Sequence, residues 1–322
     1  MNFDLSDVQS AWRTRGTALG VEVRDDAAAP RVVAAAARAA LLDAQAGLLA
    51  VALAVEAIAA ESAAAGVCVA LHSGTALALA GDDRFAGLFR GETVAAVGLS
   101  SDAVPVENSG RLSGRAPWVA PVTETGLAVV GPRRDHDRIA YAVHLDAAGV
   151  AVEGVQTSAL EGLKCAHVSF DQAWCEPIGA TQPIMTRVRV LMAAAGLGMG
   201  RRALREALST ARVAHTAAAG EQTVQGLLAD AATELDAAAM MTWKAAMAEP
   251  LSLADASLAK LMATGAAQRA VERATQVVGA DSFQAGHVIE RLARDVRALE
   301  LFAGRTEALR AAVAEEILPT VE

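Results

Sequence analysis

The second half of the chain constrains the fold most, because four long stretches there carry apolar residues at the spacing of a helix face. Val224, Leu228 and Leu235, for example, lie four and seven residues apart. Helices bury such stripes by packing against one another, and short connections favour antiparallel neighbours. We therefore expect a four-helix bundle with helices at Arg187 to Leu208, Gln222 to Met247, Leu251 to Val278 and Val288 to Phe302.

The composition supports a mostly helical protein. Of 322 residues, 53% are hydrophobic but only 3% are aromatic, so alanine, leucine and valine must build the core, and alanine is the best helix former. A net charge of −9 argues against a nucleic-acid partner, which requires a basic face. Cys68, Cys165 and Cys175 are scattered without ligand spacing, so we expect reduced cysteines in a cytoplasmic protein and no metal site.

In the middle of the chain the apolar residues recur with a different spacing. From about Thr93 to Phe170, short apolar runs such as Leu127 to Val130 and Ile139 to Val143 lie between glycine, proline and aspartate turns, which indicates a small all-β module. Residues 3–80 again carry helical patterns. We expect a helical domain at 1–90, a β-domain at 91–178 and the bundle at 179–322.

The N-terminal part indicates neither export nor membrane insertion. Its first residues lack a basic region and a cleavage site, so we expect no signal peptide. Its longest apolar run, Ala46 to Val55, is well short of the roughly 18 residues that a membrane span requires. We expect a cytoplasmic protein with no membrane partner, whose alanine-rich helices are interrupted near Gly47 and Gly66.

The stretch from Gln276 to Arg310 carries the most specific motif. It reads Q-V-V-G-A-D-S-F-Q-A-G-H-V-I-E-R-L-A-R-D-V-R-A-L-E-L-F-A-G-R-T-E-A-L-R. This resembles, without a gap, the C-terminal signature of the acyl-CoA dehydrogenases, Q-x-x-G-G-x-G-Y, then E-R-x-x-R-D, then E-G-T-S-E. The matching or nearly matching residues are Gln276, Gly279, Phe283, Glu290, Arg291, Arg294, Asp295, Gly304 and Glu307.

The resemblance implies a fold and a cofactor. Members of the family have N-terminal helices, a β-barrel and a C-terminal four-helix bundle, and they bind FAD. In the family the glutamine and glycine contact the FAD of the neighbouring subunit, which implies that role for Gln276 and Gly279. The E-G-T segment carries the catalytic base and a flavin contact, which implies flavin contacts for Gly304 and Thr306.

The departures from the signature are equally informative. Ala280 and Ser282 replace glycines, and Ala303 stands where the family has its catalytic glutamate. Arg305 occupies the threonine position, although Thr306 follows it. The motif therefore lacks its base.

The base is also missing from the other position that the family uses. Some members carry the glutamate on the first bundle helix, and the equivalent position here is Val188. Glu300 lies one helical turn before Ala303, so a displaced base at Glu300 is the weaker alternative. General base catalysis contributes roughly 10²–10⁴-fold to a reaction rate, and a chain without the carboxylate loses that factor.

The β-module carries a second resemblance. Gly110 to Ala120 is similar to the family's G-x-x-L-x-G-x-x-x-W-[IV]-[ST] segment, whose tryptophan and hydroxyl pack against the flavin ring. Trp118 is present, but Ala120 replaces the hydroxyl. The family's upstream T-E-P-x-x-G-S-D loop is reduced to Gly98 to Asp102. Trp118 can therefore be a flavin contact or a core tryptophan of the barrel.

A third resemblance lies in the bundle. Gln222 to Asp230 is similar to the family's Q-x-x-Q-x-x-L-A-D, which follows an arginine that reaches the FAD pyrophosphate across the dimer. Arg212 fits that arginine only if one residue is deleted, with His215 in place of phenylalanine. A guanidinium pairs well with phosphate oxygens, but an arginine at a helix end is also common as a solvated charge.

Together these features resemble the shortened, non-catalytic subunit of the heterotetrameric acyl-CoA dehydrogenases that actinobacteria use in lipid and steroid catabolism. The expected partners are an acyl-CoA substrate, a longer homologue (or a second copy of this chain) and an electron-acceptor flavoprotein. The apolar run from Ala237 to Met241 also indicates an interface. The alternatives are a self-sufficient oxidoreductase with a displaced base and a flavin-free scaffold of the same fold.

Overall fold

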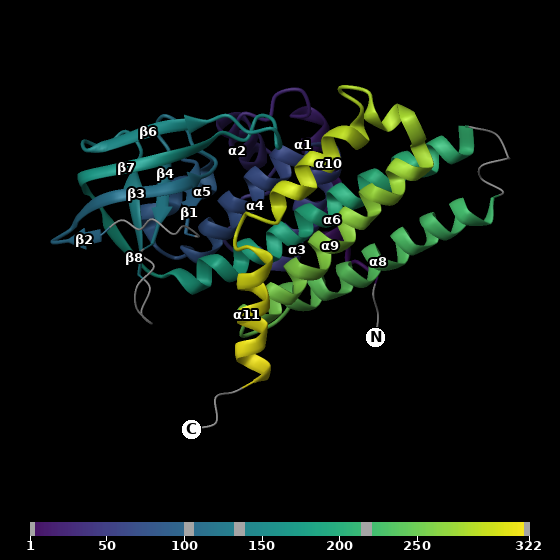
Figure 1. Ribbon diagram of the computed structural model, residues 1–322. Coiled ribbons are helices and arrows are strands. Elements are labelled where there is room, and N and C mark those ends of the chain that lie inside the picture. Colours follow the sequence, from purple (N-terminus) through teal and green to yellow (C-terminus); the bar gives the residue numbers. More distant parts are fainter. Residues whose placement is uncertain (1–3, 100–105, 132–138, 214–220, 319–322) are drawn as a thin grey trace.

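The computed structural model describes residues 4–99, 106–131, 139–213 and 221–318. The fold is mostly helical with one small β-domain, as the sequence predicts. Figure 1 shows the β-domain at one end of the molecule and the long helices extending away from it. The helices before the β-domain are α1 Asp7–Glu22, α2 Ala29–Arg38, α3 Leu48–Glu61, α4 Ala63–Ala78, the 3-10 turn η1 Asp83–Phe85, and α5 Ala86–Arg90.

Helix α1 begins with a capping box at Ser6. The Ser6 hydroxyl accepts the Gln9 N–H at 3.3 Å, and Gln9 Oε1 accepts the Ser6 N–H at 2.9 Å. Gly47 precedes α3, as expected. The expected interruption near Gly66 is wrong, because α3 and α4 divide at Ser62 and Gly66 lies inside α4. Gly66 instead faces Ala59 so closely that a Cβ would overlap it, so this glycine permits the contact between α3 and α4.

Among the described residues, two four-stranded sheets form the β-domain. One has the order β1-β4-β5-β8, with β1 parallel to β4, and the other has the antiparallel order β2-β3-β7-β6. A bridge between Val97 and Ala120 joins them, and apolar side chains of both sheets fill one interior. The strands are β1 Ala95–Gly98, β2 Val106–Asn108, β3 Arg111–Val119, β4 Leu127–Val130, β5 Ile139–His144, β6 Val150–Val155, β7 Cys165–Trp174 and β8 Glu176–Ala180.

Helix α6 is the centre of the bundle, since it packs against α3, α4, α8, α9 and α10. It is longer than the sequence predicts and starts at Thr181, because Pro183 is compatible with the first turn of a helix. Small residues allow close packing, and a Cβ on Gly200 would lie 2.6 Å from Leu235 Cδ2. The helices are α6 Thr181–Val213, α8 Gln222–Ala246, α9 Leu253–Val278, the 3-10 turn η2 Gly279–Phe283, α10 Val288–Leu299 and α11 Thr306–Ile317.

Helices α6 and α9 run side by side in the same direction with a constant register. A residue of α6 faces a residue about 67 positions later in α9. The pairs that fix this register are Arg189 with Ser257, Gly196 with Ala263 and Gly200 with Ala267. The same offset brings the C-terminal end of α6 level with the C-terminal end of α9.

Helix α10 attaches the β-domain to the bundle. Its apolar residues Ile289, Leu292, Val296 and Leu299 are buried, as their spacing predicts. On its other side, the Asp295 carboxylate accepts the Leu160 N–H at 2.5 Å, and Arg294 donates to the Ser158 carbonyl. The E-R-x-x-R-D motif therefore fastens the loop between β6 and β7. Within α10, Arg294 Nε donates to Glu290 Oε1 at 2.7 Å.

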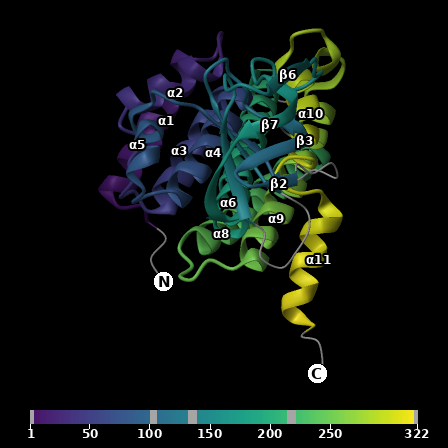
Figure 2. The ribbon, with the colours of Figure 1, turned by 90° about the vertical axis from the view of Figure 1, so that its left-hand side faces the viewer.

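Helix α10 ends at Leu299, three residues earlier than the sequence predicts. Beyond it, α11 packs against α9, and its C-terminal part extends past the other helices in both views (Figures 1 and 2). Leu309 is its only buried residue. Within the residues described, no helix is both long and apolar enough to cross a bilayer.

Candidate functional site

The turn at residues 302–304, between α10 and α11, is the first part of the candidate site. Ala303 and Gly304 have φ angles of 55° and 110°. A positive φ suits glycine but costs alanine about 1–3 kcal/mol, so contacts elsewhere must hold the turn. A Cβ on Gly304 would lie 3.1 Å from Arg189 Nη2, and glycine therefore allows the backbone to approach that guanidinium.

Two buried cations hold this turn through its backbone. Lys260 of α9 is 1% exposed, and its Nζ donates to the Gly304 carbonyl at 2.7 Å and to the Phe302 carbonyl. Arg189 of α6 is 7% exposed, and its Nε donates to the Ala303 carbonyl at 3.0 Å. Three successive carbonyl oxygens thus point at two positive charges.

Burial shifts the proton affinity of both cations. Burial, with a smaller contribution from neighbouring Arg189, lowers the pKa of Lys260 to about 7. Burial lowers the pKa of Arg189 to about 10. Neither residue is among those predicted from the sequence. The sequence feature that could have identified Lys260 is a lysine among the apolar core positions of α9, close to Ala259 and Ala263.

The two positions at which the resemblance predicts a catalytic glutamate are both buried. Ala303 is 8% exposed, and Val188 is fully buried. Val188 packs against α4, since a Cβ on Gly74 would lie 2.7 Å from Val188 Cγ2 and 2.9 Å from its backbone nitrogen. The alternative base Glu300 is partly exposed, with a carboxylate oxygen 3.5 Å from the Arg297 guanidinium.

Trp118 lies on the outer side of the sheet β2-β3-β7-β6. It has a φ of 56° and sits in a register shift of β3 between Ala116 and Val119, both fully buried. Its side chain is 54% exposed, so the interpretation as a core tryptophan is wrong. The bulge turns the indole outward, which alternation along a regular strand does not predict. Ala120, at the family's hydroxyl position, is fully buried beside Val97.

Arg212, Gln276 and Gly279 form a second group, here called the far-end group. The register of α6 and α9 places Arg212 at the level of Gly279, and Gln276 lies one helical turn before it. Arg212 and Gln276 are exposed. Gly279 has a φ of 73°, and the position of its missing Cβ is open, so another molecule can approach its backbone.

The structure therefore separates the predicted cofactor residues instead of gathering them at one place. Val188, Gly304 and Thr306 lie near the start of α6, whereas Arg212 lies ~36 Å further along the same helix at 1.5 Å per residue. Trp118 belongs to the β-domain. Residues Ser100 to Asp102 of the reduced loop, and His215 after Arg212, lie outside the described residues.

His72 of α4 is a structural residue. Its Nε2 contacts the Leu88 carbonyl at 3.0 Å, and its Nδ1 accepts the Ala95 N–H at 3.1 Å. Burial lowers the pKa of His72 to about 4, so the neutral ring links α4 to α5 and β1.

Comparisons with known proteins agree with the sequence motifs. The family described as Acyl-CoA dehydrogenase, C-terminal domain, matches residues 179–318. A 3-sulfinopropanoyl-CoA desulfinase of Paraburkholderia xenovorans is 29% identical over 216 residues, which is 61% of this chain and 52% of that protein. The human mitochondrial short-chain specific acyl-CoA dehydrogenase is 34% identical over 100 residues, 30% of this chain and 24% of that protein. The chain thus spans about half the length, or less, of these relatives.

Solved structures with the same fold cover nearly the whole chain. Butyryl-CoA dehydrogenase of Megasphaera elsdenii superposes with a TM-score of 0.86 at 17% identity, over 99% of this chain and 100% of that one. Glutaryl-CoA dehydrogenase of Mycobacterium smegmatis has a TM-score of 0.86 at 17% identity, over 99% and 96%. PigA, solved with FAD and proline, has a TM-score of 0.86 at 18% identity, over 98% and 99%.

Proposed function

We propose that the chain belongs to the acyl-CoA dehydrogenase family and is the non-catalytic subunit of a heteromeric, FAD-dependent acyl-CoA dehydrogenase. Residues 179–318 match the C-terminal domain of that family, and solved structures with the same fold cover nearly the whole chain. The reaction of the complex is α,β-desaturation of an acyl-CoA thioester. In this reading a longer homologue supplies the carboxylate that removes the α-proton.

The proposal rests on which residues occupy the two expected base positions and on how deeply they are buried. Neither Ala303 nor Val188 has an acidic side chain, and both are buried. The contact of Gly74 with Val188 also packs α4 closely against α6 at this position. A base must reach the proton it removes, so this chain neither supplies the carboxylate nor leaves room for it at position 188.

The separation of the cofactor residues supports a partner. The far-end group is too distant along α6 to share one flavin ring with the turn at 302–304. A second chain that meets the far end brings its own flavin there, where Arg212 can pair with phosphate oxygens and Gly279 allows close approach. On α8, Ala237 and Met240 are exposed, and Met240 is 50% exposed, which leaves apolar surface for an interface.

The residues present fit FAD at selected points. Trp118 offers an exposed indole face, Gly279 an open backbone, and Arg212 and Gln276 exposed polar groups. When bound, the flavin accepts the β-hydrogen as hydride. The far-end group would hold the pyrophosphate of the partner's flavin, whereas Trp118, which lies apart from it on the β-domain, would contact a flavin ring at a separate place. Gly304 and Thr306 are proposed as weaker contacts beside the turn.

The substrate and electron acceptor are finer proposals. A complex with one catalytic site per pair of subunits has space for a bulky acyl group, and we propose a polycyclic, steroid-derived acyl-CoA. A separate electron-transferring flavoprotein would reoxidise the flavin. The division at 1–90, 91–178 and 179–322 remains the domain scheme that we propose.

Co-expression tests the function directly. The chain is purified alone and together with a longer homologue that carries E-G-T at the position of Ala303 to Arg305, and each is assayed with steroid-derived and butyryl-CoA thioesters and a ferrocenium acceptor. We expect a stable complex with 450 nm flavin absorbance and turnover, and no turnover by the isolated chain.

The other outcomes identify the alternatives. Steady turnover by the isolated chain that Glu300→Gln abolishes would establish the displaced base and overturn the non-catalytic assignment. A chain that ignores the homologue at micromolar concentration and gives no flavin absorbance in either preparation would be a flavin-free scaffold.

A further inference from the structure

The Trp118 indole is held outward in a conformation that its own backbone does not favour. Its φ is positive, its neighbours Ala116 and Val119 are fully buried, and the indole itself is 54% exposed. A large aromatic side chain in this setting has several directions open to it. A neighbouring contact must select one of them if Trp118 is to present a defined surface.

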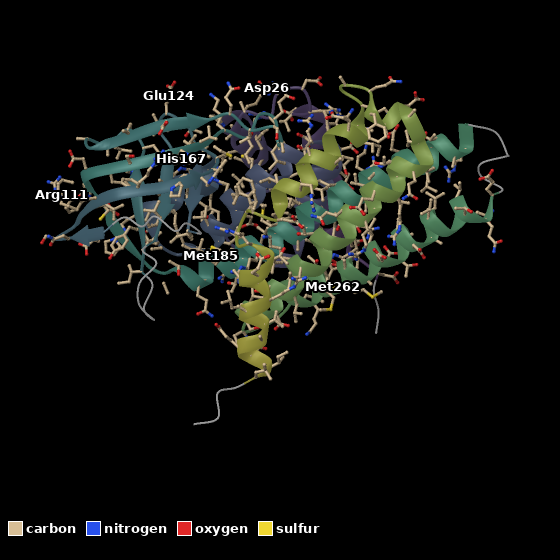
Figure 3. The ribbon with its side chains drawn as sticks, viewed as in Figure 1. Asp26, Arg111, Glu124, His167, Met185 and Met262 are labelled. Atoms are coloured by element: carbon tan, nitrogen blue, oxygen red, sulfur yellow. The ribbon has the colours of Figure 1, made fainter. Side chains whose placement is uncertain are left out.

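His167 supplies that contact. It lies on β7, the strand next to β3, and its ring centroid is 5.6 Å from that of Trp118 with an interplanar angle of 77°. This is an edge-to-face arrangement, in which the edge of one ring meets the face of the other. Figure 3 labels His167 on the β-domain.

Within the described chain, His167 makes no hydrogen bond through Nδ1 that would compete with its contact with Trp118. Its Nδ1 is buried and has no hydrogen-bond partner in the part of the chain that the structure describes. Buried polar atoms without partners are uncommon. Because Nδ1 is one of them, the ring contact with Trp118 is not set by a hydrogen bond from Nδ1 to another group. Glu153, opposite His167 on β6, is instead paired with Arg115 at 2.8 Å.

We propose that His167 is a positioning residue that fixes the Trp118 indole with its free face outward, where it can stack on a planar ring. The identity of that ring rests on the proposed function, in which it is the isoalloxazine of FAD. The positioning itself does not require the flavin, so the two can be tested separately.

The first measurement uses the full chain without flavin. The near-UV circular dichroism of Trp118 is obtained as the difference between the wild type and Trp118→Phe. We expect His167→Ala to remove at least about half of this signal and His167→Phe, which keeps an aromatic edge, to retain most of it. Ser169→Ala, on the same face of β7, is the matched control and should change nothing. Far-UV spectra verify that each variant is folded.

The second measurement titrates FAD into complexes of the same variants with the longer homologue, and it follows tryptophan quenching and 450 nm absorbance. We expect His167→Ala and Trp118→Phe to weaken FAD binding roughly two- to tenfold, the range for one aromatic contact, and His167→Phe to restore it. An unchanged Trp118 signal in His167→Ala, or equal losses in the alanine and phenylalanine variants, overturns the positioning role. A lost signal with FAD binding unchanged in every variant keeps that role but refutes the flavin contact at Trp118.

Discussion

Replacing Lys260 with methionine tests how the buried cations hold the 302–304 turn. The wild-type ammonium donates to the carbonyls of Phe302 and Gly304 while it is 1% exposed. Methionine has a similar length and removes both the charge and the two hydrogen bonds. The variant therefore loses stability at every pH because carbonyls are left unpaired, but it should also lose one specific pH dependence.

That pH dependence follows from the lowered pKa. Lys260 has a pKa of about 7 in the folded chain, against 10.5 for an ordinary lysine. Between these values the unfolded chain binds a proton that the folded chain has released, so the free energy of unfolding rises with pH and is flat below the window. The slope is 1.36 kcal/mol per pH unit at most and half of that at pH 7, where Lys260 is half deprotonated, so the gain from pH 7 to pH 9 is about 2 kcal/mol.

The assay compares thermal unfolding of the wild type and Lys260→Met from pH 6 to pH 9. Burial raises the pKa of Cys68 to about 12 and lowers stability at the alkaline end, but this effect is common to both proteins and cancels in their difference. Lys164→Met, at an exposed site, is the control, and Lys260→Arg keeps a charged donor that does not titrate in this range. If the wild type and Lys260→Met have parallel pH profiles, the ammonium stays charged and the argument from burial is refuted.

Three further variants test other parts of the structure. Arg212→Ala should weaken FAD retention by the complex roughly 10- to 100-fold, the loss of one charge-assisted hydrogen bond, and full flavin occupancy after dilution would make Arg212 a surface charge only. Ala303→Glu should leave the isolated chain inactive in the ferrocenium assay, because the proposed function assigns the catalytic site to the partner chain; turnover would mean that only the base is missing. Asp295→Ala leaves the Leu160 N–H unpaired, so we expect a loss of about 1–3 kcal/mol and faster hydrogen exchange in the loop between β6 and β7, and unchanged exchange would contradict the fastening role.

Much of the fold could be predicted from the sequence because it depends on periodicity. The stripe of Ile289, Leu292 and Val296 and the runs that form β4 and β5 each specify an element with a buried face. Element ends were less accurate, since Ser62 rather than Gly66 divides α3 from α4. Glycine signals a break and also a close helix contact, and only the tertiary structure distinguishes the two.

The candidate site was harder to predict for two physical reasons. Trp118 depends on a bulge that changes which side of the strand it faces, and local pattern carries no information on that register shift. Lys260 and Arg189 act on backbone carbonyls of residues far away in the sequence, so no side-chain motif connects them to the turn. The roles of Arg212, Gln276, Gly279, Gly304 and Thr306 toward a flavin remain predictions.

Because α6 is one continuous helix, its length fixes the distance between the turn at 302–304 and the far-end group. It begins next to the turn at 302–304 and ends beside Gly279, so the spacing of those two places is set by the rise per residue alone. Inserting or deleting one residue in α6 would shift Arg212 by about 1.5 Å along the helix axis, in opposite directions, and would rotate it by about 100° around that axis. Substitutions along the exposed side of α6 leave this distance unchanged. A change in the length of α6 would instead move and rotate the far-end group, so that it no longer matches the surface of a partner that binds there.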